Sequence, residues 1–293
     1  MAYMLLLTAV MMWSFVGVLV KYASLMVDSS TITLCRFLFG VIFLGILITI
    51  NRQDFAMDWK NKWVWIGAIG KCINYIFENI AIAIGFAYGN IITLPIQTVF
   101  LAVMSVFHFG EKITMRKLFS ILLCIAGVLL VSWKDSFAEL VNTNFTTVLF
   151  TISAIGAGVH VLSQKKLIGR MDSASSNFSI FLLCTMITGA PVPYTFHTTG
   201  TFTVIGAVAL VALGLITGIS FYINSKVLAR LPLLTIAIFT NFSVIFSLLW
   251  AWLFFNEPIT GYVILGAVTF IIGIVLLSVP QKEKLQAEAS ENF

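Results

Sequence analysis

Three ionisable side chains lie inside long apolar stretches of this sequence: Arg36, Lys71 and Glu78. Inside a bilayer such a group costs about 2.5–3.5 kcal/mol on insertion scales, so it is kept mainly where it binds a substrate, carries a proton or pairs with another charge. A buried carboxylate can bind a cation or exchange a proton, and an ammonium can bind a carboxylate. These three residues are therefore the first candidates for chemistry.

Two of them belong to a polar stripe in the apolar stretch 63–85. Lys71, Asn74, Tyr75 and Glu78 stand at i, i+3, i+4 and i+7, so a helix places all four on one face. Such a stripe is explained either by hydrogen bonds that join helices, at about 0.6 kcal/mol a pair, or by a substrate cavity. We favour the cavity, because a matching stripe occurs later in the chain.

The matching stripe appears when the sequence is shifted by 146 residues, which places polar residues on the same three positions. These residues are Thr217, Ser220 and Asn224, and Phe221 falls on the position of Tyr75. The polar faces of the two halves are expected to meet.

Arg36 and Glu78 lie at similar predicted depths, roughly 8–11 Å from the same end of their spans at a rise of 1.5 Å per residue. They can form an ion pair that only joins two helices, or Glu78 can bind a substrate cation or carry a coupling proton. Lys71 lies about 21 Å from that end. Without a partner, it would attract a carboxylate, which points to an amino acid or an organic anion as substrate.

Two further stretches add polar and aromatic candidates. Pro95, near Gln97, maps onto Asn241 by the same shift, and a proline inside a spanning helix frees a backbone carbonyl that transporters often use at binding sites. Trp13 can stack on a planar or cationic substrate. The predicted substrate-binding residues are Trp13, Lys71, Asn74, Tyr75, Glu78, Gln97, Ser220, Phe221, Asn224 and Asn241.

The composition is that of a membrane protein. Of 293 residues, 60% are hydrophobic and 10% are charged, compared with roughly 25% charged in a soluble domain. The basic residues behind the net charge of +5 are scattered between apolar stretches, so no nucleic-acid partner is expected. The four cysteines lack C-x-x-C spacing and His160 lacks a second ligand at metal-binding spacing, so we expect no disulfide, metal or cofactor.

Stretches of about 20 mostly apolar residues, the length that crosses a bilayer as a helix, can be placed ten times. They are 3–23, 31–50, 63–85, 90–109, 117–133, 145–163, 176–195, 203–224, 233–253 and 261–279. With the N-terminus inside, thirteen of the 17 Lys and Arg lie in inner loops, and only Lys21 and Lys134 lie outside. We expect an all-α protein that crosses the cell membrane ten times, with both termini in the cytoplasm.

The sequence also repeats internally. FGEKIT at 109–114 recurs 146 residues later as FNEPIT at 255–260, and AGVLLVS at 126–132 aligns with IGIVLLS at 272–278. This predicts a first five-helix repeat over 1–140, a second over 141–280 and a cytoplasmic tail over 281–293. Because five is odd, the second repeat enters the bilayer from the opposite side, which is the inverted architecture of many secondary transporters.

The glutamates of these two motifs, Glu111 and Glu257, each precede a threonine by three residues. Each threonine can cap the next helix, where the negative charge of the glutamate meets the favourable N-terminal dipole. Both glutamates are therefore expected to mark a helix boundary at the membrane edge, with a gating contact as the alternative.

The ten spans, the Trp13-Ser14 and Arg36-Phe37 pairs and the glutamate-x-x-threonine boundary after the fourth and ninth spans resemble the EamA-type drug/metabolite transporter superfamily. The resemblance covers nearly the whole chain. It implies a central cavity lined by spans one to four and six to nine, with spans five and ten outside, and alternating access. Members of the family move amino acids, other metabolites, drugs and sugars, mostly outward, so the resemblance fixes no single substrate.

An enzyme is not expected, because the sequence has no H-E-x-x-H, G-x-S-x-G or P-loop motif. Our first hypothesis is a secondary transporter that exports a small polar metabolite such as an amino acid, with protons as a candidate coupling ion. The alternatives are a flippase for a lipid-linked substrate and a non-transporting membrane sensor or interaction protein. The expected partners are the substrate and the lipid bilayer, and the protein is expected to be a monomer or a homodimer.

Overall fold

The computed structural model describes residues 2–53, 57–109, 114–133, 137–167, 170–228 and 233–278. Within these ranges the chain is helical, and the β-structure there is limited to one isolated bridge between Val27 and Thr198. The all-α class is therefore confirmed. Glu111 and the predicted tail 281–293 lie outside the described residues.

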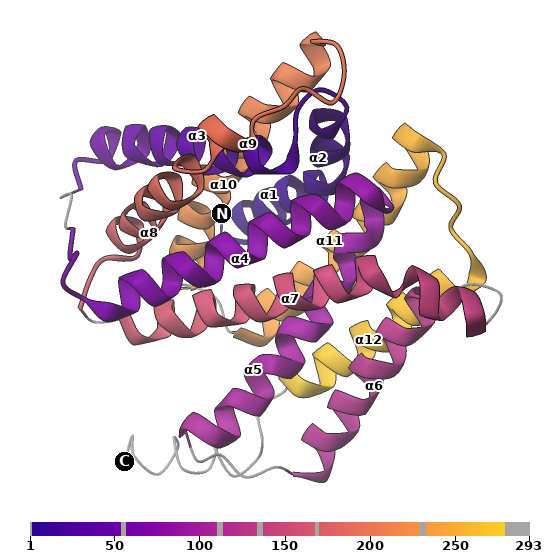
Figure 1. The fold of residues 1–293 in the computed structure, drawn as a ribbon. Coiled ribbons are helices and arrows are strands. Elements are labelled where there is room, and N and C mark those ends of the chain that lie inside the picture. The colour runs from indigo at the N-terminus through magenta and orange to yellow at the C-terminus, as the bar shows by residue number, and fades with distance from the viewer. Residues whose placement is uncertain are drawn as a thin grey trace, which may run out of the picture.

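The helices follow one another with short connections (Figure 1). They are α1 (Ala2–Ser14), α2 (Val16–Ser24), α3 (Ser29–Ile50), α4 (Lys62–Ile84), the 3-10 helix η1 (Ala87–Ile92), α5 (Thr93–Phe109), α6 (Met115–Val131), α7 (Phe137–Leu167), α8 (Ser173–Gly189), α9 (Val192–Thr195), α10 (Val204–Leu228), α11 (Leu233–Phe255) and α12 (Gly261–Ser278).

Each predicted span falls on one of these helices or on two consecutive ones. In the described part of the chain, six helices are long and apolar enough to cross a membrane, and the segments Phe239–Phe255 and Gly261–Leu277 are shorter apolar helices. A multi-pass membrane protein is thus supported, while the count of ten spans and the side of the termini stay predictions.

The helix starts follow local chemistry. Asp28 caps α3, accepting hydrogen bonds from the backbone N–H of Ser30 at 2.9 Å and of Thr31 at 3.0 Å. Burial disfavours the charge of Asp28, but hydrogen bonds from Ser30, Thr31 and His197 outweigh it and lower its pKa below the ordinary 3.8. Pro95 lies in the first turn of α5, directly after η1, where a missing backbone N–H is tolerated because the first N–H groups of a helix have no partner within it.

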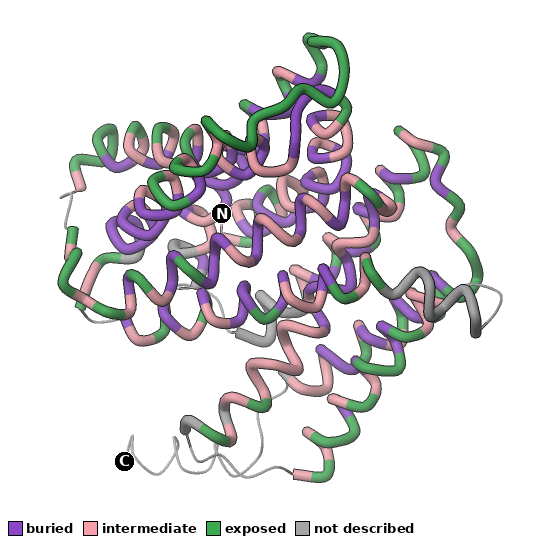
Figure 2. The backbone as a smooth tube through the Cα atoms, in the orientation of Figure 1, coloured by how far each residue is buried: buried purple, intermediate pink, exposed green. Residues whose placement is uncertain are grey.

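Helices of the two predicted repeats pack against each other throughout the bundle. α4 lies along α7, α3 along α10, and α6 along α12 (Figure 1). One buried apolar cluster joins both halves and includes Ile32, Ile82, Phe150, Leu213 and Phe270. The buried positions face inward and many exposed ones lie on the outer sides (Figure 2), which is the arrangement expected where the solvent for the outer surface is lipid.

The α6–α12 crossing depends on glycine. A Cβ on Gly127 would lie 2.7 Å from the carbonyl oxygen of Gly266, and a Cβ on Gly266 would lie 2.6 Å from that of Gly127. Such distances leave no room for a side chain, so the two backbones touch directly. The face of α12 that carries Gly266 therefore packs against α6 of the same chain.

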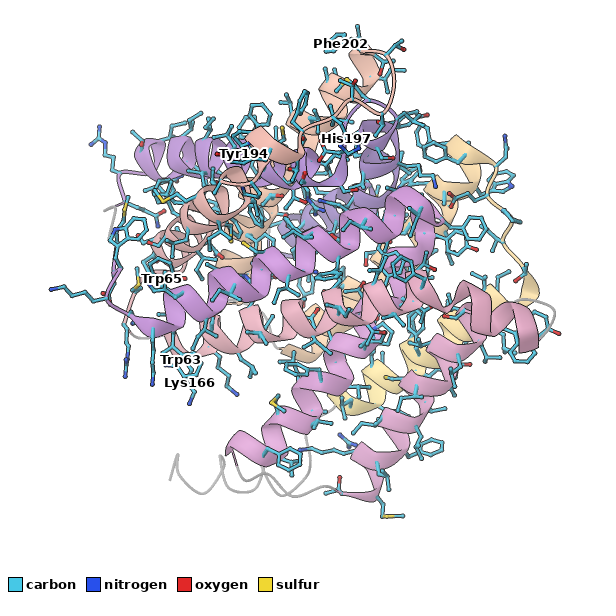
Figure 3. All side chains as sticks on the ribbon, in the orientation of Figure 1. Trp63, Trp65, Lys166, Tyr194, His197 and Phe202 are labelled. Atoms are coloured by element: carbon cyan, nitrogen blue, oxygen red, sulfur yellow. The ribbon has the colours of Figure 1, made fainter. Side chains whose placement is uncertain are left out.

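Aromatic side chains gather at two opposite ends of the bundle. Figure 3 shows Trp63, Trp65 and Lys166 at one end and Tyr194 and Phe202 at the other. Trp65 is 43% exposed, and Tyr194 and Phe202 are 92% and 76% exposed. Aromatic residues are enriched at both membrane–water interfaces, and exposed aromatic side chains at two ends agree with that distribution.

Candidate functional site

A cavity of about 490 Å³ lies between the two halves of the bundle. Its lining residues come from α1, α2, α3, α4, η1, α5, α7, α8, α10 and α11, and none of those described comes from α6 or α12. The cavity has the size of a small-molecule site. The two helices that correspond to spans five and ten pack against each other outside it.

Most of the predicted binding residues reach this cavity, and two do not. Those that line it are Trp13, Lys71, Asn74, Tyr75, Glu78, Gln97, Phe221 and Asn224. Ser220 is buried and donates its hydroxyl hydrogen to the carbonyl of Ile216 within α10. Asn241 is also buried, and it is not among the lining residues. The 146-residue shift therefore identified polar positions, but packing decides which of them reach the cavity.

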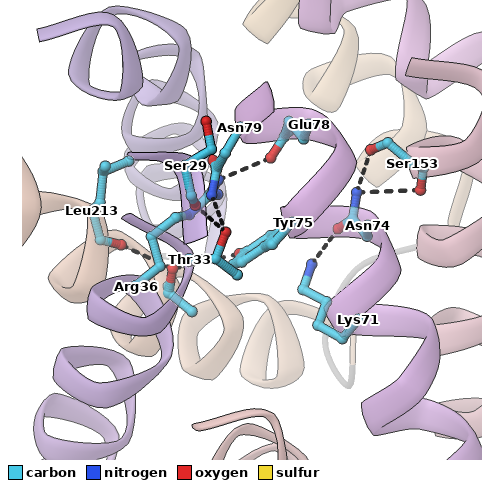
Figure 4. Close-up of polar contacts among 11 residues, drawn as sticks. Ser29, Thr33, Arg36, Lys71, Asn74, Tyr75, Glu78, Asn79, Ser153 and Leu213 are labelled. Atoms are coloured by element: carbon cyan, nitrogen blue, oxygen red, sulfur yellow. Dashed lines mark hydrogen bonds and ion pairs between the residues drawn. The ribbon is translucent and has the colours of Figure 1, made fainter. Parts of the chain in front are cut away.

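Arg36 and Glu78 form a buried ion pair, with Nη1 of Arg36 3.0 Å from Oε2 of Glu78 (Figure 4). The same Nη1 donates to Oδ1 of Asn79 at 2.7 Å, and Asn79 Nδ2 donates to Thr33 Oγ1 at 2.8 Å. The guanidinium carbon also lies 3.5 Å from the centre of the Tyr75 ring. The pair joins α3 to α4. Both charged residues also line the cavity, so a ligand in the cavity can contact them.

Asn79 was not among the predicted residues. It stands four residues after Tyr75 and therefore shares the polar face of α4. The sequence contained a signal that could have identified Asn79, because an asparagine inside an apolar span needs a hydrogen-bond partner. Only the structure shows that its partners are Arg36 and Thr33.

Lys71 has a different environment. Its Nζ donates to Oδ1 of Asn74 at 2.9 Å and lies 4.1 Å from the ring centre of Tyr75 and 4.5 Å from that of Phe221. Asn74 is held in turn, because its Nδ2 donates to Oγ of Ser153 at 2.8 Å (Figure 4). No carboxylate of the described residues forms an ion pair with Lys71, which is 5% exposed.

His160 of α7 lies on the same side of the cavity. Its Nδ1 is 3.3 Å from the carbonyl oxygen of Gly67, and its ring packs edge-on against Phe221 with a centroid distance of 5.9 Å. A carbonyl only accepts, so Nδ1 carries the proton and Nε2 is an acceptor. The structure places His160 both in the core and on the cavity wall.

The polar faces of the two halves meet at this site. The hydroxyl oxygens of Tyr75 and Thr217 are 3.4 Å apart, and Phe221 contacts both Lys71 and Trp13. Among the described residues there is no group of three His, Cys, Asp or Glu that could hold a metal ion. The site is suited to binding a small polar molecule.

One end of the cavity is closed by contacts between the halves. Glu257 follows α11 and accepts hydrogen bonds from the backbone N–H of Ala87 at 2.8 and 2.9 Å and of Tyr88 at 3.4 Å. Lys21 donates to the carbonyl oxygens of Gly85 and Ile82 beside it.

The expected threonine cap of the next helix is observed, because Thr260 Oγ1 accepts a hydrogen bond from the backbone N–H of Val263 at 3.4 Å. The carboxylate of Glu257 itself does not contact that helix start. Glu257 lies on the N-terminus of η1 instead, because its side chain is buried against the other half.

The charge of Glu257 is disfavoured by burial, which raises its pKa above the ordinary 4.5, although the N–H groups of Ala87 and Tyr88 and the charge of Lys21 oppose the shift. The cavity does not reach these closing residues. At its opposite end the lining includes Gln164, Lys165 and Met171, and Lys165 is exposed. Access is thus from the end of the bundle where α7 ends and α8 begins.

Two helical halves around a central cavity that contains several polar side chains and is closed at one end are typical of small-molecule membrane transporters. The sequence model of the EamA-like transporter family matches the chain over residues 1–133 and again over 144–279, so the protein belongs to this family. A search of curated proteins gave no significant match.

A solved structure described as "Crystal structure of protein" shares the fold, with a TM-score of 0.68 and 16% sequence identity. The alignment covers 94% of this chain and 97% of that one. The likeness therefore extends over the whole bundle, and at this identity it concerns the fold alone.

Proposed function

We propose that the protein is a secondary transporter of a small polar metabolite that works by alternating access between its two halves. The observation that carries this proposal is the one-sided cavity, open beside Lys165 and closed by the contacts of Glu257 with Ala87. A binding site that is open to one side and separated from the other by contacts between two repeats is what alternating access requires. Reversing the opening needs only a rearrangement of the halves around the cavity.

The direction that fits best is export. The positive-inside rule favours a cytoplasmic side for the open end, because this end carries Lys165 and Lys166. In this state the cavity takes up substrate from the cytoplasm. Glu78 is the candidate for proton coupling, because it is the one carboxylate among the described residues that line the cavity.

Efflux from proteoliposomes tests the proposal. Vesicles with purified protein are loaded with a mixture of small metabolites, and loss of each is followed by mass spectrometry against vesicles without protein. Ala157, which lines the cavity, is replaced by phenylalanine to fill it, and Val268, 49% exposed on α12, receives the same replacement as a control. We expect Ala157→Phe to abolish efflux and Val268→Phe to leave it unchanged.

Coupling is tested with the same vesicles under a pH gradient. If Glu78 carries the proton, Glu78→Gln makes efflux independent of the gradient. The transporter proposal fails if no metabolite leaves the vesicles, or if Ala157→Phe transports as well as the wild type. Unchanged pH dependence in Glu78→Gln removes the coupling role and leaves the Arg36–Glu78 pair as a structural contact.

A further inference from the structure

We infer that the ligand of this cavity is an organic anion whose carboxylate binds the ammonium group of Lys71. The inference rests on the proposed function for one point only, namely that the cavity is the substrate site. It goes further by selecting one class of substrate, because an amino acid with an uncharged side chain is a zwitterion without net charge and many drugs are cations.

The first argument is the balance of charge. Among the described residues that line the cavity, four are charged, three basic and one acidic: Arg36, Lys71, Lys165 and Glu78. The acidic residue is already paired, since Glu78 Oε2 lies 3.0 Å from Arg36 Nη1. Lys71 thus has no ion-pair partner of its own among the described residues, because the nearby Glu78 is bound to Arg36, and a buried charge of this kind is costly until an anion neutralises it.

The second argument is the geometry of the ammonium group. Lys71 has three N–H donors, and Asn74 accepts one of them at 2.9 Å. The rings of Tyr75 and Phe221 contact the ammonium at 4.1 and 4.5 Å and hold it in place, but they accept no conventional hydrogen bond. The remaining donors of this fixed, cavity-lining group suit a carboxylate, which accepts charge-assisted hydrogen bonds.

The third argument concerns the rest of the ligand. His160 Nε2, Asn90 Oδ1 and Thr93 Oγ1 are buried polar atoms for which the described residues provide no hydrogen-bond partner, and all three residues line the cavity. Nε2 and Oδ1 are acceptors, and buried acceptors are normally satisfied. The ligand is therefore expected to carry a hydrogen-bond donor such as a hydroxyl group beside its carboxylate.

Two matched series of compounds test the inference on the purified wild-type protein, with thermal stabilisation as the readout of binding. The phenyl series is mandelate, phenylacetate, mandelamide, 2-amino-1-phenylethanol and phenylglycine. The methyl series is lactate, propionate, lactamide, 1-amino-2-propanol and alanine. Sodium chloride at equal concentration controls for ionic strength. In at least one series we expect the hydroxy acid to bind roughly 10- to 100-fold more tightly than its amide or its amine.

Variants then assign the contact. Lys71→Gln is expected to remove the preference for the carboxylate over the amide, and Lys71→Arg to keep it, because the positive charge remains. Lys62, which is exposed at the start of the same helix and does not line the cavity, serves as the control, and Lys62→Gln should bind as the wild type does. His160→Phe should reduce the advantage of mandelate over phenylacetate without affecting the carboxylate preference.

The inference is overturned if neither hydroxy acid binds, if an amide, amine or amino acid binds as tightly as the corresponding acid, or if Lys71→Gln retains the preference. These outcomes are separate from failure of transport. Lys71-dependent binding of an anion that no proteoliposome assay can move would leave the anion site standing and refute the transporter. Efflux of a cation or neutral compound, without carboxylate binding, would support the transporter and refute the anion site.

Discussion

The carboxylate of Glu257 accepts hydrogen bonds from the backbone N–H of Ala87 at 2.8 and 2.9 Å, although 170 positions separate the two residues in the sequence. The contact fixes the segment after α11 to the first turn of η1, and it closes the cavity at the end away from Lys165. A negative charge at this position also interacts favourably with the positive end of the helix dipole. The glutamate thus joins the two halves at this end of the bundle.

Removing this carboxylate should therefore open the closed end. Hydrogen bonds to a charged group contribute about 1.5–3 kcal/mol, so Glu257→Ala should raise the open fraction on the order of 10- to 100-fold. A cysteine replacing Asn90, which lines the cavity, can report this in a background free of the native cysteines. We expect Glu257→Ala to increase its labelling by an impermeant maleimide added to the side that the closed end faces.

Glu257→Gln provides the matched comparison, because its amide oxygen still accepts one hydrogen bond from Ala87. Its labelling rate should fall between those of the wild type and Glu257→Ala. Equal labelling in all three proteins would show that the Glu257–Ala87 contact does not control access.

The raised pKa of Glu257 predicts a pH dependence of stability. The folded protein holds the proton of this carboxyl more tightly than the unfolded chain does, so the free energy of unfolding should fall as the pH rises from 4.5 through the raised pKa. Thermal unfolding of the wild type and of Glu257→Gln, measured side by side between about pH 4 and 7, isolates this contribution. The wild type should lose stability relative to the variant as the pH rises, and parallel profiles would contradict the prediction.

The Arg36–Glu78 pair is expected to stabilise the bundle only as a pair. Removing one partner leaves a buried charge unpaired, so Arg36→Met or Glu78→Leu alone should cost about 3–5 kcal/mol. The double variant should recover much of this loss, since two apolar side chains can fill the same space. A double-mutant cycle from denaturant unfolding in detergent measures the coupling. Additive losses would show that the two side chains act independently.

The α6–α12 crossing gives a prediction that does not involve charge. A Cβ at position 127 would lie 2.7 Å from the carbonyl oxygen of Gly266 and 2.7 Å from the Cβ of Phe270, and valine adds two methyl groups to that Cβ. Gly127→Val should therefore destabilise the protein by about 1–3 kcal/mol. Gly261→Ala is the control, because nothing lies within 4 Å of the added Cβ there. Its effect on the unfolding temperature should be close to zero. Similar losses in both variants would mean that the crossing has room to adjust.

The helical class and the positions of the helices were predictable, because long apolar stretches in a bilayer must satisfy their backbone hydrogen bonds internally. The polar face of α4 was predictable for a similar reason, since helical periodicity alone places Lys71, Asn74 and Glu78 together. The roles of Ser153 and His160 were not. Each is a single polar residue on α7, and each contacts α4 at the site only because α7 packs directly against α4.

The sequence by itself determined an apolar, twice-repeated helical chain with a few polar residues spaced along its helices, because periodicity and composition are local properties. Only the tertiary structure decided what those residues do. It paired Glu78 with Arg36, left Lys71 beside two aromatic rings without a carboxylate, and placed Glu257 on the far half of the bundle. Pairing of this kind depends on which helices lie side by side, and residues far apart in the chain carry no local signal of it.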